Sequence, residues 1–343
     1  MNQNASVLQQ RERTLFATAG TPLPRVGLGC MGMSEFYGPS DDTQSLRALH
    51  IAYDVGYRQF DTADVYGMGH NERLLAHFLR ELGPERRASV YLATKVGIRR
   101  MPGTPVTIVA DSSPEYVASA YEAGLERLGL DRVDLLYVHR RSADVPIEET
   151  VGKLAELVRA GKLGAIGLSE VSAQTLHKAC AVFPIAALQS EYSLWTRDVE
   201  AELLPACREL GVAFVPYSPL GRGFLTGKLT PADIASPGDL RQSIPRFAAG
   251  NFSKNSELLG PLTKVAAELG TTMAQVALAW VLAQDAGIYP IPGARREEHL
   301  RSNFAAGKLT LSAEQLQLLS AHFSLHDAAG ARLPPQLLAA VNL

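Results

Sequence analysis

Cysteine is scarce in this sequence of 343 residues, which has three, at positions 30, 180 and 207, without Cys-x-x-Cys spacing. We therefore expect neither a disulfide framework nor a cysteine-based zinc site. Charge of one sign is not in excess either, because 33 basic residues face 35 acidic ones and leave a net charge of −2. The chain thus lacks the electrostatic footprint of a protein that binds duplex nucleic acid or an anionic membrane.

Long hydrophobic runs are also missing. The longest in a region with helical periodicity, Val276 to Ala283, has eight residues, whereas a membrane-spanning helix needs roughly twenty. The first residues, Met1 to Arg13, are polar and contain no apolar signal-peptide core. We therefore expect a cytoplasmic protein that does not enter a membrane. Self-assembly into a homo-oligomer is left open.

Motifs for a resident metal are absent as well. None of the eight histidines stands in a His-Glu-x-x-His motif. His322 and His326 are four residues apart, but no third ligand accompanies them. We therefore expect no metal site.

Short apolar segments recur along the chain with helical stretches between them. They are aliphatic or β-branched and are bounded by turn residues, as expected of strands buried on both faces. There are eight, at residues 26–29, 58–60, 90–93, 133–138, 163–168, 186–188, 212–215 and 288–291. Strict alternation of strands and helices predicts a parallel sheet, and eight units favour a closed (β/α)8 TIM barrel of the α/β class.

Local signals locate several helices. Pro114 suits a first helical position with Ser113 as its N-cap. Residues 146–158 and 273–284 carry apolar side chains at helical spacing. These stretches fall between the predicted strands, as the barrel requires.

Two further features complete the predicted domain organisation. Ser312 and the residues after it form a capping box that opens an extra C-terminal helix. Residues 221–255, rich in Gly, Pro, Ser and Arg, predict a long and functional loop after the seventh strand. We expect a single barrel domain over residues 14–325, with tails at 1–13 and 326–343.

Four titratable residues follow three consecutive predicted strands. Asp61 ends the second strand and Tyr66 lies in the loop behind it, while Lys95 ends the third strand and His139 the fourth. Because such barrels carry their active sites at the C-terminal ends of the strands, these side chains should converge. Taken singly, each also has an ordinary interpretation: a turn aspartate, a packed tyrosine, a solvated lysine or a structural histidine.

Together the four could transfer a proton to a carbonyl oxygen. A tyrosine with an ordinary pKa near 10 is a weak acid, and a nearby ammonium should lower that pKa by stabilising the phenolate. A carboxylate would hold the ammonium charged, and the histidine would hydrogen-bond the carbonyl. A Schiff-base lyase acting through Lys95 remains an alternative.

The common nucleotide-binding motifs do not occur in their usual context. Residues 27–32 have the spacing Gly-x-Gly-x-x-Gly, but the first two glycines lie inside the predicted strand at 26–29 and do not open a first helix, and there is no Walker A loop. The best candidate for holding a phosphate is the segment from Ile291 to Arg296, which leaves the last strand and enters a helix with two arginines. An ordinary solvated helical turn is the alternative interpretation.

These segments resemble the aldo-keto reductase family from about Leu15 to Phe323. The matching segments are Gly-Leu-Gly-Cys-Met-Gly-Met at 27–33, Phe-Asp-Thr-Ala-Asp-Val-Tyr-Gly at 60–67, Ala-Thr-Lys-Val at 93–96, Tyr-Val-His-Arg at 137–140, Gly-Leu-Ser-Glu at 167–170, Gln-Ser-Glu-Tyr at 189–192, Tyr-Ser-Pro-Leu-Gly-Arg-Gly-Phe-Leu at 217–225 and Ile-Pro-Gly-Ala-Arg at 291–295. The stretch from 189 to 225 resembles the bacterial and plant branch that acts on assorted aldehydes and ketones.

The resemblance implies a barrel that binds NADPH across its open end and reduces carbonyl compounds. The family's catalytic tetrad falls on Asp61, Tyr66, Lys95 and His139, with Tyr66 as general acid. The implied coenzyme contacts are Gly32, Met33, Asp61, Ser169, Gln189, Tyr217, Ser218, Leu220, Arg222, Gly223, Lys228, Gly293, Arg295, His299 and Asn303. We expect NADP in preference to NAD because two arginines, at 295 and 296, suit a 2′-phosphate.

The sequence departs from the family pattern at several of these positions. Glu170 stands where many members have asparagine, which puts a contact with the nicotinamide amide in question. His299 replaces a commoner Arg, Lys or Gln, and residues 140–143 differ from the usual Arg-Val-Asp-Pro. Phe36, Trp195 and residues 228–254 are expected to line the substrate pocket. An alternative function within the resemblance is an NADP-binding, redox-sensing regulatory subunit.

Overall fold

A computed structural model describes residues 17–18, 21–100, 108–323, 328–338 and 341. The predicted tail at 1–13 and His326 lie outside the described residues. Seven strands form a parallel sheet in the order β3-β4-β5-β8-β9-β10-β11. Their bounds are β3 Leu28–Gly29, β4 Gln59–Asp61, β5 Tyr91–Val96, β8 Leu135–Val138, β9 Ala165–Ser169, β10 Ile185–Glu191 and β11 Ala213–Tyr217.

The eighth strand closes the barrel through isolated bridges. Gly29 pairs with Gly293 on one side, and Phe214 pairs with Ile288 on the other. On the β3 side the carbonyls of Pro290 and Pro292 accept hydrogen bonds, but proline has no N–H to return them. Gly29 allows the close approach, since a Cβ there would lie 2.7 Å from the Ile291 carbonyl oxygen. The predicted (β/α)8 barrel is thus confirmed, with its last strand weakly paired.

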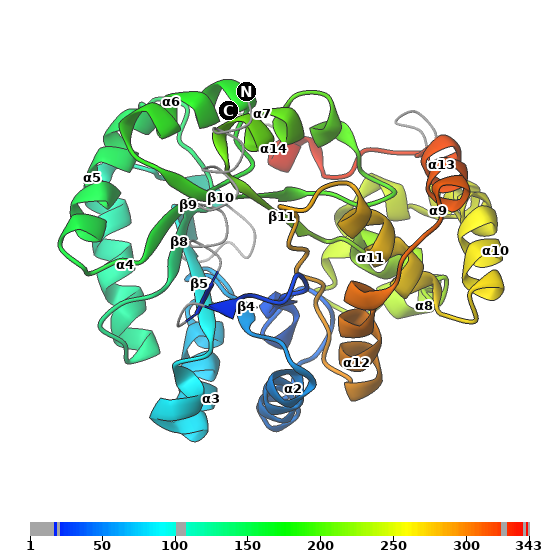
Figure 1. Ribbon diagram of the computed structural model, residues 1–343, viewed down its shortest axis with the longest axis horizontal. Coiled ribbons are helices and arrows are strands. Elements are labelled where there is room, and N and C mark those ends of the chain that lie inside the picture. Colours follow the sequence, from blue (N-terminus) through cyan, green and yellow to red (C-terminus); the bar gives the residue numbers. More distant parts are fainter. Residues whose placement is uncertain (1–16, 19–20, 101–107, 324–327, 339–340, 342–343) are drawn as a thin grey trace.

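Helices surround the strands (Figure 1). The α-helices are α2 Asp42–Val55, α3 His70–Arg87, α4 Pro114–Leu128, α5 Ile147–Arg159, α6 Ala173–Val182, α7 Leu203–Leu210, α8 Pro231–Ile234, α9 Ala249–Ser256, α10 Gly260–Glu268, α11 Met273–Ala283, α12 Glu297–Ala305, α13 Ala313–His322 and α14 Pro335–Leu338. Short 3-10 helices are η1 Met31–Met33, η2 Asp198–Glu200, η3 Gly221–Thr226, η4 Leu240–Ser243, η5 Pro245–Phe247, η6 Glu257–Leu259 and η7 Ala306–Lys308. Two small antiparallel pairs, β1 Ala17–Thr18 with β2 Thr21–Pro22 and β6 Ile98–Arg100 with β7 Ile108–Ala110, complete the strands.

The predicted helix starts are mostly confirmed. The Ser312 hydroxyl accepts from the Gln315 N–H in a complete capping box at the start of α13. Pro114 occupies the first turn of α4 after Ser113, as expected. The Ser113 hydroxyl, however, donates to the Asp111 carboxylate at 2.6 Å and does not cap the helix.

The segment after β11 is more structured than a long loop. It contains η3, α8, η4, η5 and α9, each of only three to eight residues. Their turns are too short to show helical periodicity in the sequence, which explains why none was predicted. Trp195, expected in the pocket wall, stacks on Phe224 from this segment with ring centroids 4.0 Å apart and is 5% exposed. It therefore anchors the segment to the barrel.

The core has two parts. Side chains such as Tyr91, Leu135 and Val215 fill the inside of the barrel, and a larger cluster that includes Trp280 lies between the strands and the helices.

No single helix of the described residues is long and apolar enough to span a membrane. One bent pair, Ala249–Glu268 with Met273–Ala283 at 95°, meets that criterion by length and composition.

Candidate active site

Backbone strain is concentrated at one end of the barrel. Five non-glycine residues of the described part have positive φ: Phe36, Met68, Glu170, Ser218 and Arg222. Each lies in a loop that follows β3, β4, β9 or β11. Such conformations cost free energy and are typically kept at functional sites. The C-terminal ends of the strands, called the barrel mouth below, are therefore the candidate working face.

Three of the four predicted catalytic side chains form a continuous network at the mouth. Lys95, on β5, forms an ion pair with Asp61 at the end of β4. Its Nζ lies 2.8 Å from the Thr62 carbonyl oxygen and 3.1 Å from the Tyr66 hydroxyl. The side chains of Lys95 and Asp61 are 0% and 2% exposed.

This geometry assigns the direction of each hydrogen bond. An ammonium has three donors and no acceptor, and all three donors of Lys95 are engaged. The Tyr66 oxygen therefore accepts from Lys95, which leaves the phenolic proton free for another acceptor. Tyr66 is 8% exposed, so a proton acceptor can reach its hydroxyl only through a narrow opening at the mouth.

The ionisation of the network differs in part from the expectation. Burial raises the pKa of Tyr66 and outweighs the opposing effect of the Lys95 ammonium. The predicted net lowering of this pKa is therefore wrong, although Lys95 does act in the expected direction. Burial lowers the pKa of Lys95, but Asp61 and Tyr66 more than compensate and raise it. Tyr66 is thus protonated at neutral pH and lies beside a charged ammonium.

His139 follows β8 and packs edge-on against Tyr66. The two ring centroids are 5.9 Å apart with an interplanar angle of 87°. Burial, Arg140 and Lys95 all hold the pKa of His139 well below its usual value, so the imidazole is neutral. Its Nδ1 is buried and has no hydrogen-bond partner among the described residues. A neutral imidazole can donate one hydrogen bond to a carbonyl oxygen without competing as an acid.

The predicted nicotinamide residues lie beside this network. Ser169, at the end of β9, is 2% exposed, and its Oγ lies 3.3 Å from Arg140. Gln189, on β10, is committed to the network itself, because its Nε2 donates to Asp61 Oδ2 at 2.8 Å. Burial raises the pKa of the adjacent Tyr217.

The turn after β11 has a left-handed backbone. Gly221, Arg222 and Gly223 have φ values of 56°, 56° and 97°, which explains the two glycines that flank the arginine. Arg222 also forms an ion pair with Glu191 at 3.1 Å. Of the remaining predicted contacts here, Ser218 and Leu220 precede η3 and Lys228 is exposed.

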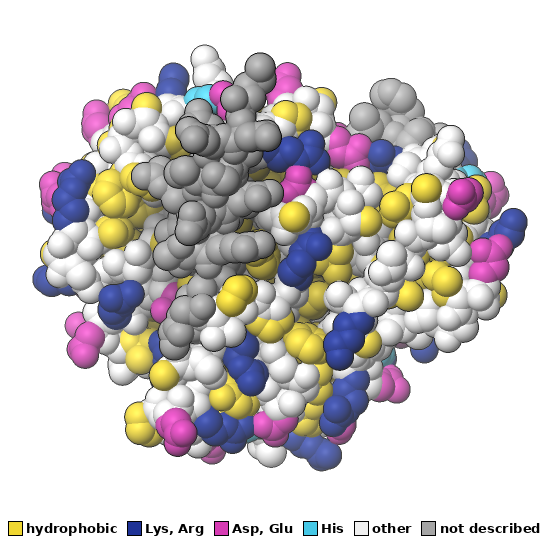
Figure 2. Space-filling view, viewed as in Figure 1, with side chains coloured by type: hydrophobic (Ala, Val, Ile, Leu, Met, Phe, Trp, Pro, Cys, Tyr) yellow, Lys and Arg dark blue, Asp and Glu magenta, His cyan; other side chains and the backbone are white. Residues whose placement is uncertain are grey.

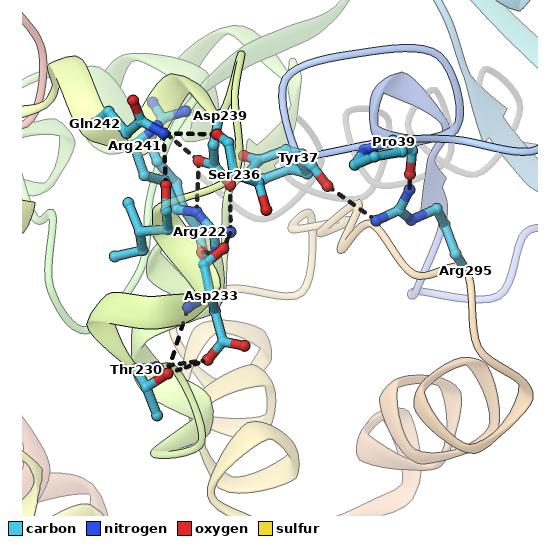
Figure 3. Close-up of polar contacts among 11 residues, drawn as sticks. Tyr37, Pro39, Arg222, Thr230, Asp233, Ser236, Asp239, Arg241, Gln242 and Arg295 are labelled. Atoms are coloured by element: carbon cyan, nitrogen blue, oxygen red, sulfur yellow. Dashed lines mark hydrogen bonds and ion pairs between the residues drawn. The ribbon is translucent and has the colours of Figure 1, made fainter.

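Arg295 ties two distant parts of the mouth together. Its guanidinium donates to the carbonyl oxygens of Tyr37 at 3.0 Å and Pro39 at 2.7 Å (Figure 3). On the other side of Figure 3, Arg241 donates to the Arg222 carbonyl and pairs with Asp239. Arg295 thus has a structural role that the sequence does not indicate.

The predicted adenosine end carries several cations near one another. Burial, Arg241 and Arg296 lower the pKa of Arg295, and burial and Arg296 lower the pKa of His299. Figure 2 shows Lys and Arg side chains over the α2 and α12 side of this face. Gly293 lies opposite Gly29, Asn303 is 3% exposed in α12, and Gly32 and Met33 belong to η1.

One charged residue near the mouth, Arg332, was not predicted from the sequence. Arg332 lies in the segment expected to be a tail, yet it pairs with Glu170 at 2.9 Å and with Glu191 at 3.3 Å. The neighbouring Leu333 is 5% exposed, and an apolar residue of this kind is the signal in the sequence for a packed segment.

Known proteins resemble the chain over nearly its whole length. The family model described as "Aldo/keto reductase family" matches residues 25–323. An aldo-keto reductase of Schizosaccharomyces pombe named yakc [NADP(+)] is 40% identical over 316 residues, 91% of this chain and 92% of that protein.

Solved structures show the same relationship. The glycerol dehydrogenase of Gluconobacter oxydans has a TM-score of 0.81 at 27% identity and covers 92% of this chain and 98% of its own. An aldo-keto reductase from Klebsiella pneumoniae, solved in complex with NADPH, has a TM-score of 0.70 at 25% identity, over 95% and 97%. With a barrel of this topology and a family match across the mouth residues, the chain belongs to the aldo/keto reductase family.

Proposed function

We propose that this protein is an NADPH-dependent reductase of aldehydes or ketones, with Tyr66 as the general acid. The observation that carries the proposal is the Tyr66 hydroxyl, which accepts a hydrogen bond from Lys95 at 3.1 Å and keeps its own proton available at the mouth. The relatives named for NADP(+) or solved with NADPH support the choice of coenzyme.

The residues of this chain fit such a coenzyme. Arg295 and Arg296 supply two positive charges suited to the 2′-phosphate, and each guanidinium can bind a phosphate with two donors. Burial lowers the pKa of the neighbouring His299, so its neutral imidazole would contribute a hydrogen bond and no charge. The strained turn at Arg222 and Gly223 would face the pyrophosphate, and Ser169 and Tyr217 the nicotinamide. When bound, the coenzyme supplies a hydride to the carbonyl carbon.

The chain's own groups handle the proton. Tyr66 donates its phenolic proton to the carbonyl oxygen as negative charge develops there. Lys95 stabilises the resulting phenolate, and Asp61 holds Lys95 charged and fixed in position. His139, neutral and beside Tyr66, orients the carbonyl by a hydrogen bond. A positioned acid of this kind is worth roughly 10²–10⁴ in rate.

The geometry disfavours the lyase alternative. Schiff-base formation requires a free lysine nitrogen that can reach a carbonyl carbon. Lys95 is 0% exposed, and its three N–H groups are bound to Asp61, Thr62 and Tyr66. The nitrogen could attack a substrate only if this network were dismantled.

The test is NADPH oxidation with a reactive aromatic aldehyde. Tyr66→Phe should lower kcat roughly 10²–10⁴-fold while the NADPH affinity stays near that of the unmodified protein. Tyr53→Phe is the matched control, because that hydroxyl bonds Ser89 away from the mouth, and it should retain full activity. Undiminished turnover in Tyr66→Phe would contradict the assignment.

A broad carbonyl panel separates this function from the regulatory one. If the unmodified protein binds NADPH tightly but turns over no carbonyl compound, an NADP-binding redox-sensing subunit becomes the better description. Turnover of aldehydes or ketones at rates above about 1 s⁻¹, within the ordinary range for enzymes, supports the reductase.

A further inference from the structure

The C-terminal segment, residues 328–338, packs onto the barrel. Asn255 Nδ2 lies 3.0 Å from the Ala329 carbonyl oxygen, and the Ala329 N–H donates to Asn255 Oδ1 at 2.8 Å. Arg246 donates to the Gly330 carbonyl at 3.2 Å. In Figure 1 this red segment runs from the side of α13 toward α7. The structured segment after β11 therefore holds it in place.

Arg332 carries a positive charge from this segment to the ends of β9 and β10. One terminal nitrogen of Arg332 lies 2.9 Å from Glu170 Oε2, and the other lies 3.3 Å from Glu191 Oε2. The side chains of Arg332, Glu170 and Glu191 are only 10%, 1% and 4% exposed. Charges this deeply buried require partners, so each depends on the others.

Glu170 is held in a strained conformation directly after Ser169. Its φ is 53°, a left-handed value that is unfavourable for a residue with a side chain. Its Oε1 accepts the Glu191 N–H at 2.9 Å, and Arg332 binds the other oxygen. Burial raises the pKa of Glu170, but Arg332 and Arg140 outweigh this effect and hold that pKa below its usual range. The carboxylate is therefore ionised and fixed.

Arg222 completes an electrically neutral set. Its guanidinium pairs with Glu191 at 3.1 Å and is 7% exposed. Two carboxylates, Glu170 and Glu191, thus face two guanidiniums, Arg222 and Arg332. The set lies between Ser169 and the turn after β11, which the proposed function assigns to the nicotinamide and the pyrophosphate. Without Arg332 these directly paired groups would carry one negative charge, while Arg140 acts on Glu170 and Arg246 on Glu191 from outside the set.

We propose that Arg332 is a positioning residue of the coenzyme site, which compensates Glu170 and Glu191 and thereby sets the relative affinity for reduced and oxidised coenzyme. The inference rests on the proposed function. The reduced nicotinamide ring is neutral and the oxidised ring is cationic. An uncompensated carboxylate beside the ring would raise the affinity for the oxidised coenzyme, which would then dissociate slowly after turnover. The positive charge of Arg332 reduces this preference, so that the affinity for the reduced coenzyme stays comparable to that for the oxidised coenzyme.

The test measures the Kd of NADPH and of NADP+ by fluorescence titration on the full chain. Arg332→Met should raise the ratio Kd(NADPH)/Kd(NADP+) roughly tenfold, the scale of one unpaired charge at an effective dielectric constant of about 20. Glu170→Gln should lower the same ratio, because it leaves a positive charge in excess. The double variant Glu170→Gln/Arg332→Met and the charge-conserving Arg332→Lys should both keep a ratio close to the original.

Arg208→Met is the matched control. It removes one guanidinium from an ion pair with Asp285 in which Arg208 is 53% exposed, and it should leave the ratio unchanged. Equal weakening of both coenzyme forms in Arg332→Met would show a merely structural role and overturn the proposal. If Arg332→Met does not fold, an unchanged ratio in Glu170→Gln overturns it instead. If the unmodified chain binds neither coenzyme, the proposed function itself fails.

Discussion

The side-chain amide of Gln189 donates a hydrogen bond to Asp61, with 2.8 Å between Nε2 and Oδ2. This bond crosses the inside of the barrel, since β10 and β4 are separated in the sheet by β9, β8 and β5. Asp61 therefore has one oxygen on Lys95 and the other on Gln189. The acid network is fixed from both sides of the barrel, which keeps the carboxylate from rotating away from the ammonium.

Gln189→Leu should weaken this network. The buried carboxylate oxygen would lose its donor, which should cost about 1–3 kcal/mol in free energy of unfolding and raise the pKa of Asp61 further. Gln59→Leu is a matched control on β4: the Gln59 amide is fully buried and lacks a hydrogen-bond partner among the described residues. That replacement should not lower stability. Urea denaturation measures the free energy of unfolding of both variants. An equal loss in the two would contradict a stabilising role for the Gln189 hydrogen bond.

Lys95 is expected to serve both stability and chemistry, and a double variant separates the two. Lys95→Met leaves Asp61 buried without its cation and should cost about 3–5 kcal/mol. Asp61→Asn/Lys95→Met removes both charges and should recover most of that stability. Carbonyl reduction should remain at least about 10²-fold down in both variants, because no ammonium stabilises the phenolate. Recovery of activity in the double variant would show that Lys95 acts only through stability.

The sequence was sufficient to predict the barrel because its strands are short apolar segments between turn residues. The eighth strand was also found from its apolar pattern, although Pro290 and Pro292 remove its donors toward β3. Hydrophobic periodicity could not reveal the short helices after β11, because a helix of so few turns does not repeat the pattern often enough to be recognised.

The residues of the candidate site could be predicted where each one stands at or just after the C-terminal end of a predicted strand. Lys95 and Asp61 meet because parallel neighbouring strands end at the same face. Arg332 could not be found in this way, since no strand positions it and its partners are more than 140 residues away in the sequence. The net pKa shift of Tyr66 was also missed, because burial depends on packing that spacing does not reveal.

The two neighbouring arginines at the adenosine end should affect the coenzymes differently. Arg296 has a side chain 72% exposed, so Arg296→Ala should weaken NADPH roughly tenfold while NADH binding stays unchanged. Arg295 also holds the carbonyls of Tyr37 and Pro39. Arg295→Ala should therefore weaken both coenzymes. Fluorescence titration with NADPH and NADH measures both effects, and equal responses of the two coenzymes to Arg296→Ala would refute a 2′-phosphate contact there.

Asp64 should make stability depend on pH. It borders a cavity of about 370 Å³ next to the site, and its Oδ1 is buried without a hydrogen-bond partner among the described residues. Burial, reinforced by Glu72 and only partly opposed by Arg127 and Lys95, raises its pKa from 3.8 to about 7. The folded protein thus holds this proton more tightly than the unfolded chain does. Stability should fall as the pH rises from about 4 to about 7 and stay lower above that.

Asp64→Asn removes this penalty, so the variant should gain stability over the unmodified protein as the pH rises. The difference between a pKa of 3.8 in the unfolded chain and about 7 in the folded protein corresponds to at most about 4 kcal/mol. Because the side chain is half-buried and solvent screens its charge, we expect about 2 kcal/mol at pH 8 and almost none at pH 4. Urea denaturation at both pH values measures the difference. Asp131→Asn, at an exposed carboxylate, should stay within about 0.5 kcal/mol throughout. An equal gain from Asp64→Asn at pH 4 and pH 8 would show that packing and not ionisation is responsible.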